Sequence, residues 1–152
     1  MGLFDIFKKK KNVEIKQEFE NNAAVEPNSQ IFQRVYEVVS DYLPKGWKNV
    51  AIYYAVSGNM THFKYYVSSG KGYINCFNLK ECSKENFRKI RSGLDIILLE
   101  DRKNLEQSKQ WSVFTMFISS AGNFQTKFGY DDISEDFLNY HENWEKENIK
   151  NK

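Results

Sequence analysis

The densest group of reactive side chains in this sequence is a set of carboxylates near its C-terminus: Asp131, Asp132, Glu135 and Asp136. Carboxylates this close together could hold a divalent cation or work as an acid–base pair in hydrolysis. Acidic residues at such spacings also mark helix starts, where they accept hydrogen bonds from free backbone amides. The three-residue step from Asp132 to Glu135 favours the second interpretation, with Asp132 capping a C-terminal helix.

The rest of the sequence offers these carboxylates no catalytic partner. Neither histidine, His62 or His141, has a cysteine or a second histidine at metal-ligand spacing. The only cysteines, Cys76 and Cys82, form no CxxC motif, and so few cysteines suit a reducing cytoplasm. The sequence contains no phosphate-binding glycine loop. We therefore predict a protein that is not an enzyme and has no catalytic, metal-binding or cofactor-binding residues. A metal-dependent hydrolase using the four carboxylates is the weaker alternative.

Tyrosines are unusually dense in the middle of the chain, at Tyr53, Tyr54, Tyr65, Tyr66 and Tyr73. Adjacent residues of a strand point to opposite faces of the sheet, so one ring of each adjacent pair is exposed unless helices cover both faces. Exposed tyrosines make a good protein-binding surface. An aromatic-rich sheet packed on both sides is an equal alternative.

Hydrophobic periodicity predicts the elements that position these residues. In chain order we expect a helix over 30–43 capped by Ser29, strands over 49–57, 61–68 and 73–77, a helix from the cap Ser83 to about 106, strands over 112–119 and 124–130, and a helix to about 149. The last helix should bury Phe137, Tyr140, His141 and Trp144. Because short turns join consecutive strands, the predicted class is α+β: a helix, a three-strand antiparallel meander, a helix, a hairpin and a C-terminal helix.

Composition divides the chain into two parts. Residues 1–28 are predicted to be a basic-apolar leader and a flexible linker, and residues 29–152 a single domain. Within the leader, residues 1–11 combine an apolar cluster with four lysines. That pattern is typical either of weak, reversible contact with an anionic membrane surface or of a disordered leader. The net charge of +2 conceals an acidic tail, because residues 131–152 carry three basic and seven acidic side chains.

Taken in order, three segments resemble the YezG-type immunity proteins, antitoxins of bacterial polymorphic toxin systems. The segments are YLPKGWKNVAIYYAV, WSVFTMFISSAGNFQTKFGYDD and YDDISEDF. The family's aromatic–Asp–Asp stretch and acidic, aromatic C-terminal segment match Tyr130, Asp131, Asp132, Phe137 and Trp144. The resemblance covers about 30–149. It implies a cytoplasmic protein, without catalytic residues, that neutralises a secreted nuclease toxin, often one exported by a type VII route.

The residues and the resemblance together predict an immunity protein that occludes a cognate nuclease toxin and does not itself bind nucleic acid. The slightly positive net charge favours blocking by shape over mimicry of nucleic acid. We expect the toxin to contact Asp131, Asp132, Glu135, Asp136, Glu142, Tyr53, Tyr65 and Tyr73. The alternative function is a non-enzymatic adaptor tethered weakly to the membrane surface by residues 1–11.

Overall fold

The computed structural model describes residues 29–149, so the predicted leader and linker, residues 1–28, lie outside the described residues. The described elements, in chain order, are α2 (Ser29–Ser40), β1 (Asn49–Ser57), β2 (Met60–Ser68), β3 (Tyr73–Asn75), η1 (Cys76–Asn78), α3 (Lys84–Leu94), η2 (Asp95–Leu99), α4 (Glu100–Lys103), η3 (Gln107–Lys109), β4 (Val113–Ser119), β5 (Phe124–Gly129) and α5 (Phe137–Asn148). The predicted α+β class and the antiparallel sheet are confirmed. No helix of this described part is both long and apolar enough to cross a membrane.

The strands form one antiparallel sheet in the order β3-β2-β1-β4-β5. Its two halves join through β1, which pairs with β2 on one side and with β4 on the other. β1 and β2 are rich in β-branched and aromatic residues, which favour extended backbone. Gly58, with φ +62°, makes the tight turn between them.

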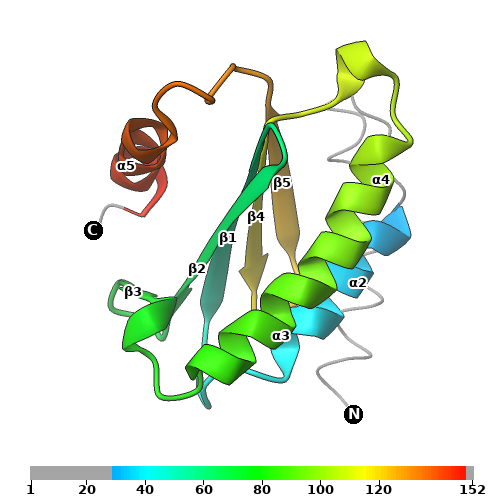
Figure 1. The fold of residues 1–152 in the computed structure, drawn as a ribbon. Helices are drawn as coiled ribbons and strands as arrows, with labels where there is room; N and C mark the ends of the chain where they lie inside the picture. The colour runs from blue at the N-terminus through cyan, green and yellow to red at the C-terminus, as the bar shows by residue number, and fades with distance from the viewer. Residues whose placement is uncertain (1–28, 150–152) are drawn as a thin grey trace.

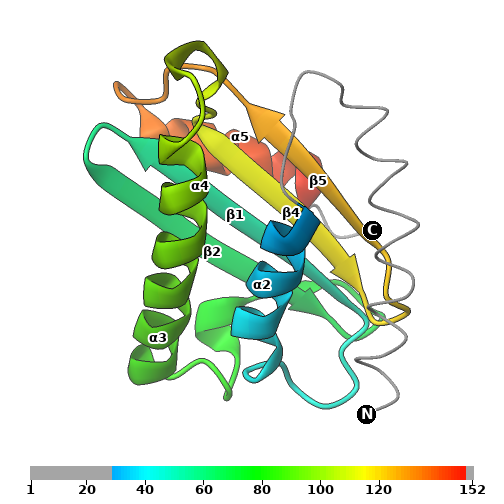
Figure 2. The ribbon, with the colours of Figure 1, turned by 90° about the vertical axis from the view of Figure 1, so that its right-hand side faces the viewer.

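Helices cover both faces of the sheet, as the two perpendicular views show (Figures 1 and 2). On one face, α2 lies beside the long helical segment formed by α3, η2 and α4. On the other face lies α5 alone. Alternate residues of the strands therefore enter two separate cores, because successive side chains point to opposite faces.

The second predicted helix is confirmed at its start and modified further along. Ser83 caps α3 by accepting a hydrogen bond from the Asn86 amide (3.0 Å). At Asp95 the helix widens into the π-helical turn η2, and it resumes as α4. Asp95, the first residue of this turn, accepts a 2.5 Å hydrogen bond from the Tyr54 hydroxyl of the sheet. The helix ends at Lys103, before the predicted limit near 106.

The predicted end of β3 and the predicted start of the last helix are both wrong. In each case a side chain accepts a backbone hydrogen bond and so starts the next turn at a different residue. β3 stops at Asn75 instead of 77, because the Asn75 side chain accepts from the Phe77 amide and starts η1. The last helix is not capped by Asp132. Asp136 accepts from the Asn139 amide (3.2 Å) and begins α5, while Asp132 accepts from the amide and hydroxyl of Ser134 in the preceding loop.

Candidate protein-binding site on the α5 side of the sheet

Trp144 anchors α5 on the sheet. It is only 6% exposed, and its indole Nε1–H donates to the Thr115 hydroxyl oxygen (2.9 Å). Its ring also packs against Tyr53 and Tyr66, with centroid separations of 4.9 and 5.7 Å. Of the four residues predicted to line the buried side of this helix, Trp144 is fully buried, whereas Phe137, Tyr140 and His141 are half-buried. The helix is therefore attached along a narrow stripe.

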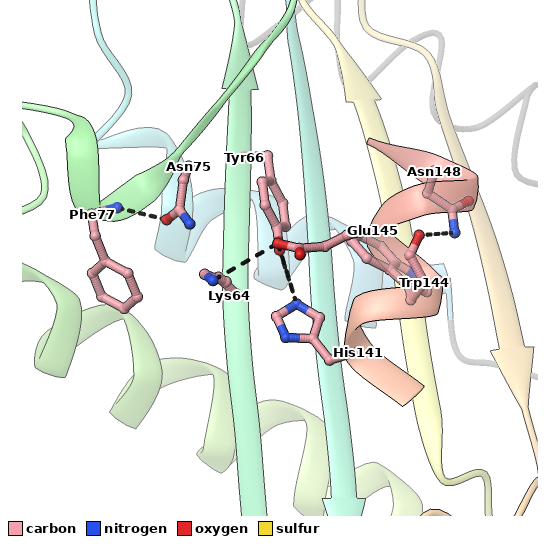
Figure 3. A network of polar contacts seen from close by, with 8 residues as sticks. All are labelled: Lys64, Tyr66, Asn75, Phe77, His141, Trp144, Glu145 and Asn148. Atoms are coloured by element: carbon pink, nitrogen blue, oxygen red, sulfur yellow. Dashed lines mark hydrogen bonds and ion pairs between the residues drawn. The ribbon is translucent and has the colours of Figure 1, made fainter. Parts of the chain in front are cut away.

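A polar network on both sides of Trp144, through His141 and Glu145, fixes the orientation of α5 (Figure 3). The Tyr66 hydroxyl donates to Glu145 (2.5 Å) and lies 2.9 Å from Nε2 of His141. Because the single hydroxyl proton goes to Glu145, Nε2 of His141 is the donor of the second bond. Lys64 adds an ion pair to Glu145 at 3.8 Å.

The network shifts the acid–base behaviour of its members. Burial, reinforced by the hydrogen bond to Glu145, raises the pKa of Tyr66 far above its usual value, so its hydroxyl remains a donor. Burial also lowers the pKa of His141, although the Glu145 carboxylate opposes this shift. His141 is therefore held mainly as neutral imidazole at neutral pH.

An acidic surface faces outward from α5 and the loop before it. It comprises the exposed carboxylates Asp131, Asp132, Glu135, Asp136 and Glu142, all five being acidic residues predicted to contact the toxin. Asp132 and Asp136 already hold the loop and the helix start. The other three form no ion pair with any residue that the structure describes.

The tyrosines predicted to contact the toxin are mostly buried, unlike the exposed carboxylates. Tyr53 is 2% exposed and Tyr65 is 0% exposed, because α5 covers one face and the helical segment of α3 covers the other. The sheet is thus the aromatic-rich sheet packed on both sides, and these two rings are not available to a partner in this conformation. Only Tyr73 remains half-buried at the surface.

Tyr73 lines a groove of about 560 Å³ between α5 and the β2–β3 edge of the sheet. Glu142 and Glu145 line its helical wall, and Asn75 lies on the strand side. The acidic surface and this groove are continuous, because Glu142 belongs to both. Sequence reasoning missed the groove, although the four-residue spacing of His141 and Glu145 on the last helix was a readable sign that both face the sheet.

The carboxylates are not arranged as a metal centre. Within residues 29–149, no group of three or more histidine, cysteine, aspartate or glutamate side chains is placed to hold a metal ion. The two histidines stack on aromatic rings instead: His62 on Phe137 at 3.9 Å and His141 on Tyr53 at 4.4 Å. The arrangement can bind a partner through charge and shape.

Comparison with known proteins places the sequence beside immunity proteins. A family model described as "Immunity protein YezG-like" matches residues 28–151. The immunity protein YezG of Bacillus spizizenii is 22% identical over 119 residues, a match that covers 72% of this chain and 72% of the relative.

Proposed function

The chain belongs to the YezG-like immunity protein family, and from this premise we propose that it binds a cognate secreted nuclease toxin in the cytoplasm and neutralises it by occlusion. Membership of an immunity protein family gives the chain an immunity role and favours a non-enzymatic one. Our proposal adds three statements to this family role: the toxin is a nuclease, it is exported by a type VII route, and the immunity protein occludes its active site.

The acidic surface carries the proposal. A nuclease must present basic groups to the phosphates of its substrate, and such a cleft attracts a cluster of carboxylates. Asp131, Glu135 and Glu142 are exposed and have no ion-pair partner among the described residues, so their charge is free to act on a partner. Fixed attachment of α5 through Trp144 holds Glu142 on a rigid element, and Asp131 and Glu135 lie in the loop that leads into that helix.

The test needs the cognate toxin, which is to be sought as a protein with a nuclease domain encoded beside this gene. An equimolar amount of the immunity protein should abolish cleavage of nucleic acid by that domain. The triple variant Asp131→Lys, Glu135→Lys and Glu142→Lys should slow association by about tenfold at low salt and flatten its salt dependence. Asp132 and Asp136 are left unchanged because they hold the loop and the helix cap.

A matched triple variant controls for net charge. Asp41→Lys, Glu100→Lys and Glu106→Lys change the charge by the same amount at exposed positions away from α5. This control should associate at nearly the wild-type rate. Equal effects of the two triple variants would remove the acidic surface from the interface, and a bound toxin that still cleaves would refute occlusion.

A further inference from the structure

A second groove, of about 310 Å³, opens along the edge of β2 on the side away from β1. Its rims carry two large apolar side chains that are unusually exposed, Phe77 of η1 at 58% and Leu138 of α5 at 67%. Figure 3 shows Phe77 on one side of β2 and α5, with His141, on the other. We propose that this groove binds an extended segment of the toxin in which an apolar side chain stands next to an acidic one.

The floor of the groove is a free strand edge. β3 pairs only with the last part of β2, from Tyr66 to Ser68, so the earlier residues have no strand beside them. In an antiparallel sheet, the N–H and C=O of one residue point to the same side, and the side alternates along the strand. The Thr61 carbonyl points away from β1, since it accepts a 2.6 Å bond from Arg91. The N–H and C=O of Phe63 point the same way.

These groups of Phe63 have no hydrogen-bond partner among the described residues, although Phe63 is only 8% exposed. Unpaired backbone groups at a nearly buried position lower stability unless water or another chain pairs them. An extended peptide laid along an open strand edge supplies the missing donor and acceptor. The geometry therefore favours an extended segment over a helix.

The chemistry of the groove selects the side chains of that segment. Phe77 and Leu138 both line the groove and leave exposed apolar surface there, which favours a partner with a ring or branched aliphatic side chain. The charged residues that line the groove, Lys64 and Arg91, are both basic, and no carboxylate lines it. Arg91 has no ion-pair partner among residues 29–149.

One further polar group points to an occupant. Nε2 of His62 is buried without a hydrogen-bond partner in the described part of the chain, and His62 lines this groove. A carboxylate beside the apolar side chain would meet Arg91 and lie within the same groove as His62. The acidic surface would thus bind a basic part of the toxin, and this groove would bind an apolar and acidic segment of the same toxin. The identity of the partner rests on the proposed function, whereas the recognition chemistry does not.

The first experiment therefore needs no toxin. Short random peptides displayed on phage are selected on the full-length protein, and an enriched peptide is synthesised for titration. We expect enrichment of an apolar residue adjacent to Asp or Glu. Binding of that peptide should weaken at least about tenfold in Leu138→Ser and in Phe77→Ser. Arg91→Gln should weaken it as well, while Arg88→Gln on the exposed face of α3 should not.

The control for lost apolar surface is Ile96→Ser, because Ile96 is also 67% exposed but lies on η2 outside this groove. This variant should bind the peptide within about twofold of wild type. Amide exchange adds a readout of strand pairing, since a bound peptide should slow exchange of the Phe63 amide by at least about tenfold. Three results would each overturn the proposal. The enriched peptides could be basic, Leu138→Ser and Ile96→Ser could weaken peptide binding equally, or exchange of the Phe63 amide could stay unchanged in the saturated complex.

Three further outcomes distinguish this inference from a second copy of the chain and from the proposed function. Concentration-dependent dimerisation that is lost in Leu138→Ser would assign the groove to a second copy of this chain and overturn the toxin segment. Toxin binding that survives Leu138→Ser and Phe77→Ser unchanged would also overturn it, while leaving the proposed function intact. The selection could also enrich the expected peptides while the protein fails to bind the nuclease encoded beside its gene. That result would refute the proposed function and leave the recognition chemistry of the groove intact.

Discussion

The two faces of the sheet are covered in different ways. The face under α2 and α3 is filled by aliphatic and aromatic side chains, and its largest members, including Ile52, Phe114 and Leu94, are fully buried. The face under α5 has two alanines in its centre, Ala51 and Ala55, and is completed by polar aromatic side chains from the helix. Both faces bury apolar area, but the face under α2 and α3 has the larger core, and the face under α5 adds directed hydrogen bonds from Tyr66 and Trp144.

This difference separates folding from binding. The face under α2 and α3 has its long-range polar contacts where the sheet meets α3 and η2, in the bonds from Tyr54 to Asp95 and from Arg91 to Thr61. The face under α5 depends on the Tyr66 network and on the Trp144–Thr115 bond. The proposed toxin contacts gather on α5, on the loop before it and along the free edge of β2, with Phe77 of η1 and Arg91 of α3 beside that edge. Changes on the first face should destabilise the whole domain, whereas changes on the second should act on α5.

The largest effect is expected from Phe114→Ala on the face under α2 and α3. Phe114 is 0% exposed and packs against Phe32, Trp111 and Phe128. Its truncation leaves a cavity in a dense core, so the free energy of unfolding should fall by about 3–5 kcal/mol. Urea denaturation followed by fluorescence measures this loss. Ile96→Ala, at an exposed position, should stay within about 0.5 kcal/mol of wild type. Similar losses in both variants would contradict the dominance of this core.

A smaller effect is expected from Tyr66→Phe on the α5 face. The variant keeps the ring against Trp144 but leaves Glu145 and His141 without their shared hydroxyl. We expect a loss of about 1–3 kcal/mol, the cost of half-buried polar groups without a partner. Faster amide exchange should be concentrated in α5. Tyr130→Phe, at an exposed tyrosine, is the control and should change little; uniform destabilisation of the sheet by Tyr66→Phe would show that the two faces are not separable.

The sequence predicts the sheet better than it predicts the site. The bounds of β1 are as expected, and β2 begins one residue early, because runs of β-branched and aromatic residues indicate extended backbone whatever covers them. The same runs do not reveal whether one face or both are covered. The binding surface that tyrosine density predicts therefore includes Tyr53 and Tyr65, although the helices bury both rings.

The site depends on contacts that no local pattern reports. Asp132 and Asp136 each precede an acceptable helix start, and only the path of the loop decides that Asp136 is the cap. The groove on β2 brings Phe77 and Leu138 together from distant parts of the chain. It exists because β3 is too short to cover β2, and that shortness follows from a turn made by one Asn75 side chain.

The next effect in size tests the helix start. Asp136→Ala removes the side chain that accepts from the Asn139 amide, so one of the free amides of α5 loses its partner. The free energy of unfolding should fall by about 1 kcal/mol. Asp131→Ala removes an exposed carboxylate of the same surface that makes no capping bond, and should change stability by less than about 0.5 kcal/mol. If Asp132→Ala, rather than Asp136→Ala, gave the larger loss, the assignment of the cap would be wrong.

The smallest effect is expected from the charge state of His141. The groups that act on it come from both sides of the contact: Glu142 and Glu145 favour its protonated form, whereas Lys64 and His62 oppose it. Burial is the strongest influence, and it lowers the pKa of His141. The face under α2 and α3 contains no histidine among its buried residues, so this pH dependence belongs to the α5 side of the described structure.

Because the pKa of His141 is lower in the folded protein than in the unfolded chain, the unfolded chain takes up the proton first as the pH falls. The stabilisation is therefore complete above about pH 6.5, the ordinary imidazole value, and is lost progressively below it. Between about pH 7.5 and 5.5, we expect the wild type to lose up to about 1 kcal/mol more than His141→Gln, which keeps a side-chain donor for the Tyr66 oxygen. Urea unfolding at the two pH values, with amide exchange to locate the change in α5, measures the difference. Equal pH dependence in the two proteins would mean that protonation of His141 does not loosen α5, and would leave His62, whose pKa burial and Arg91 also lower, as the group responsible.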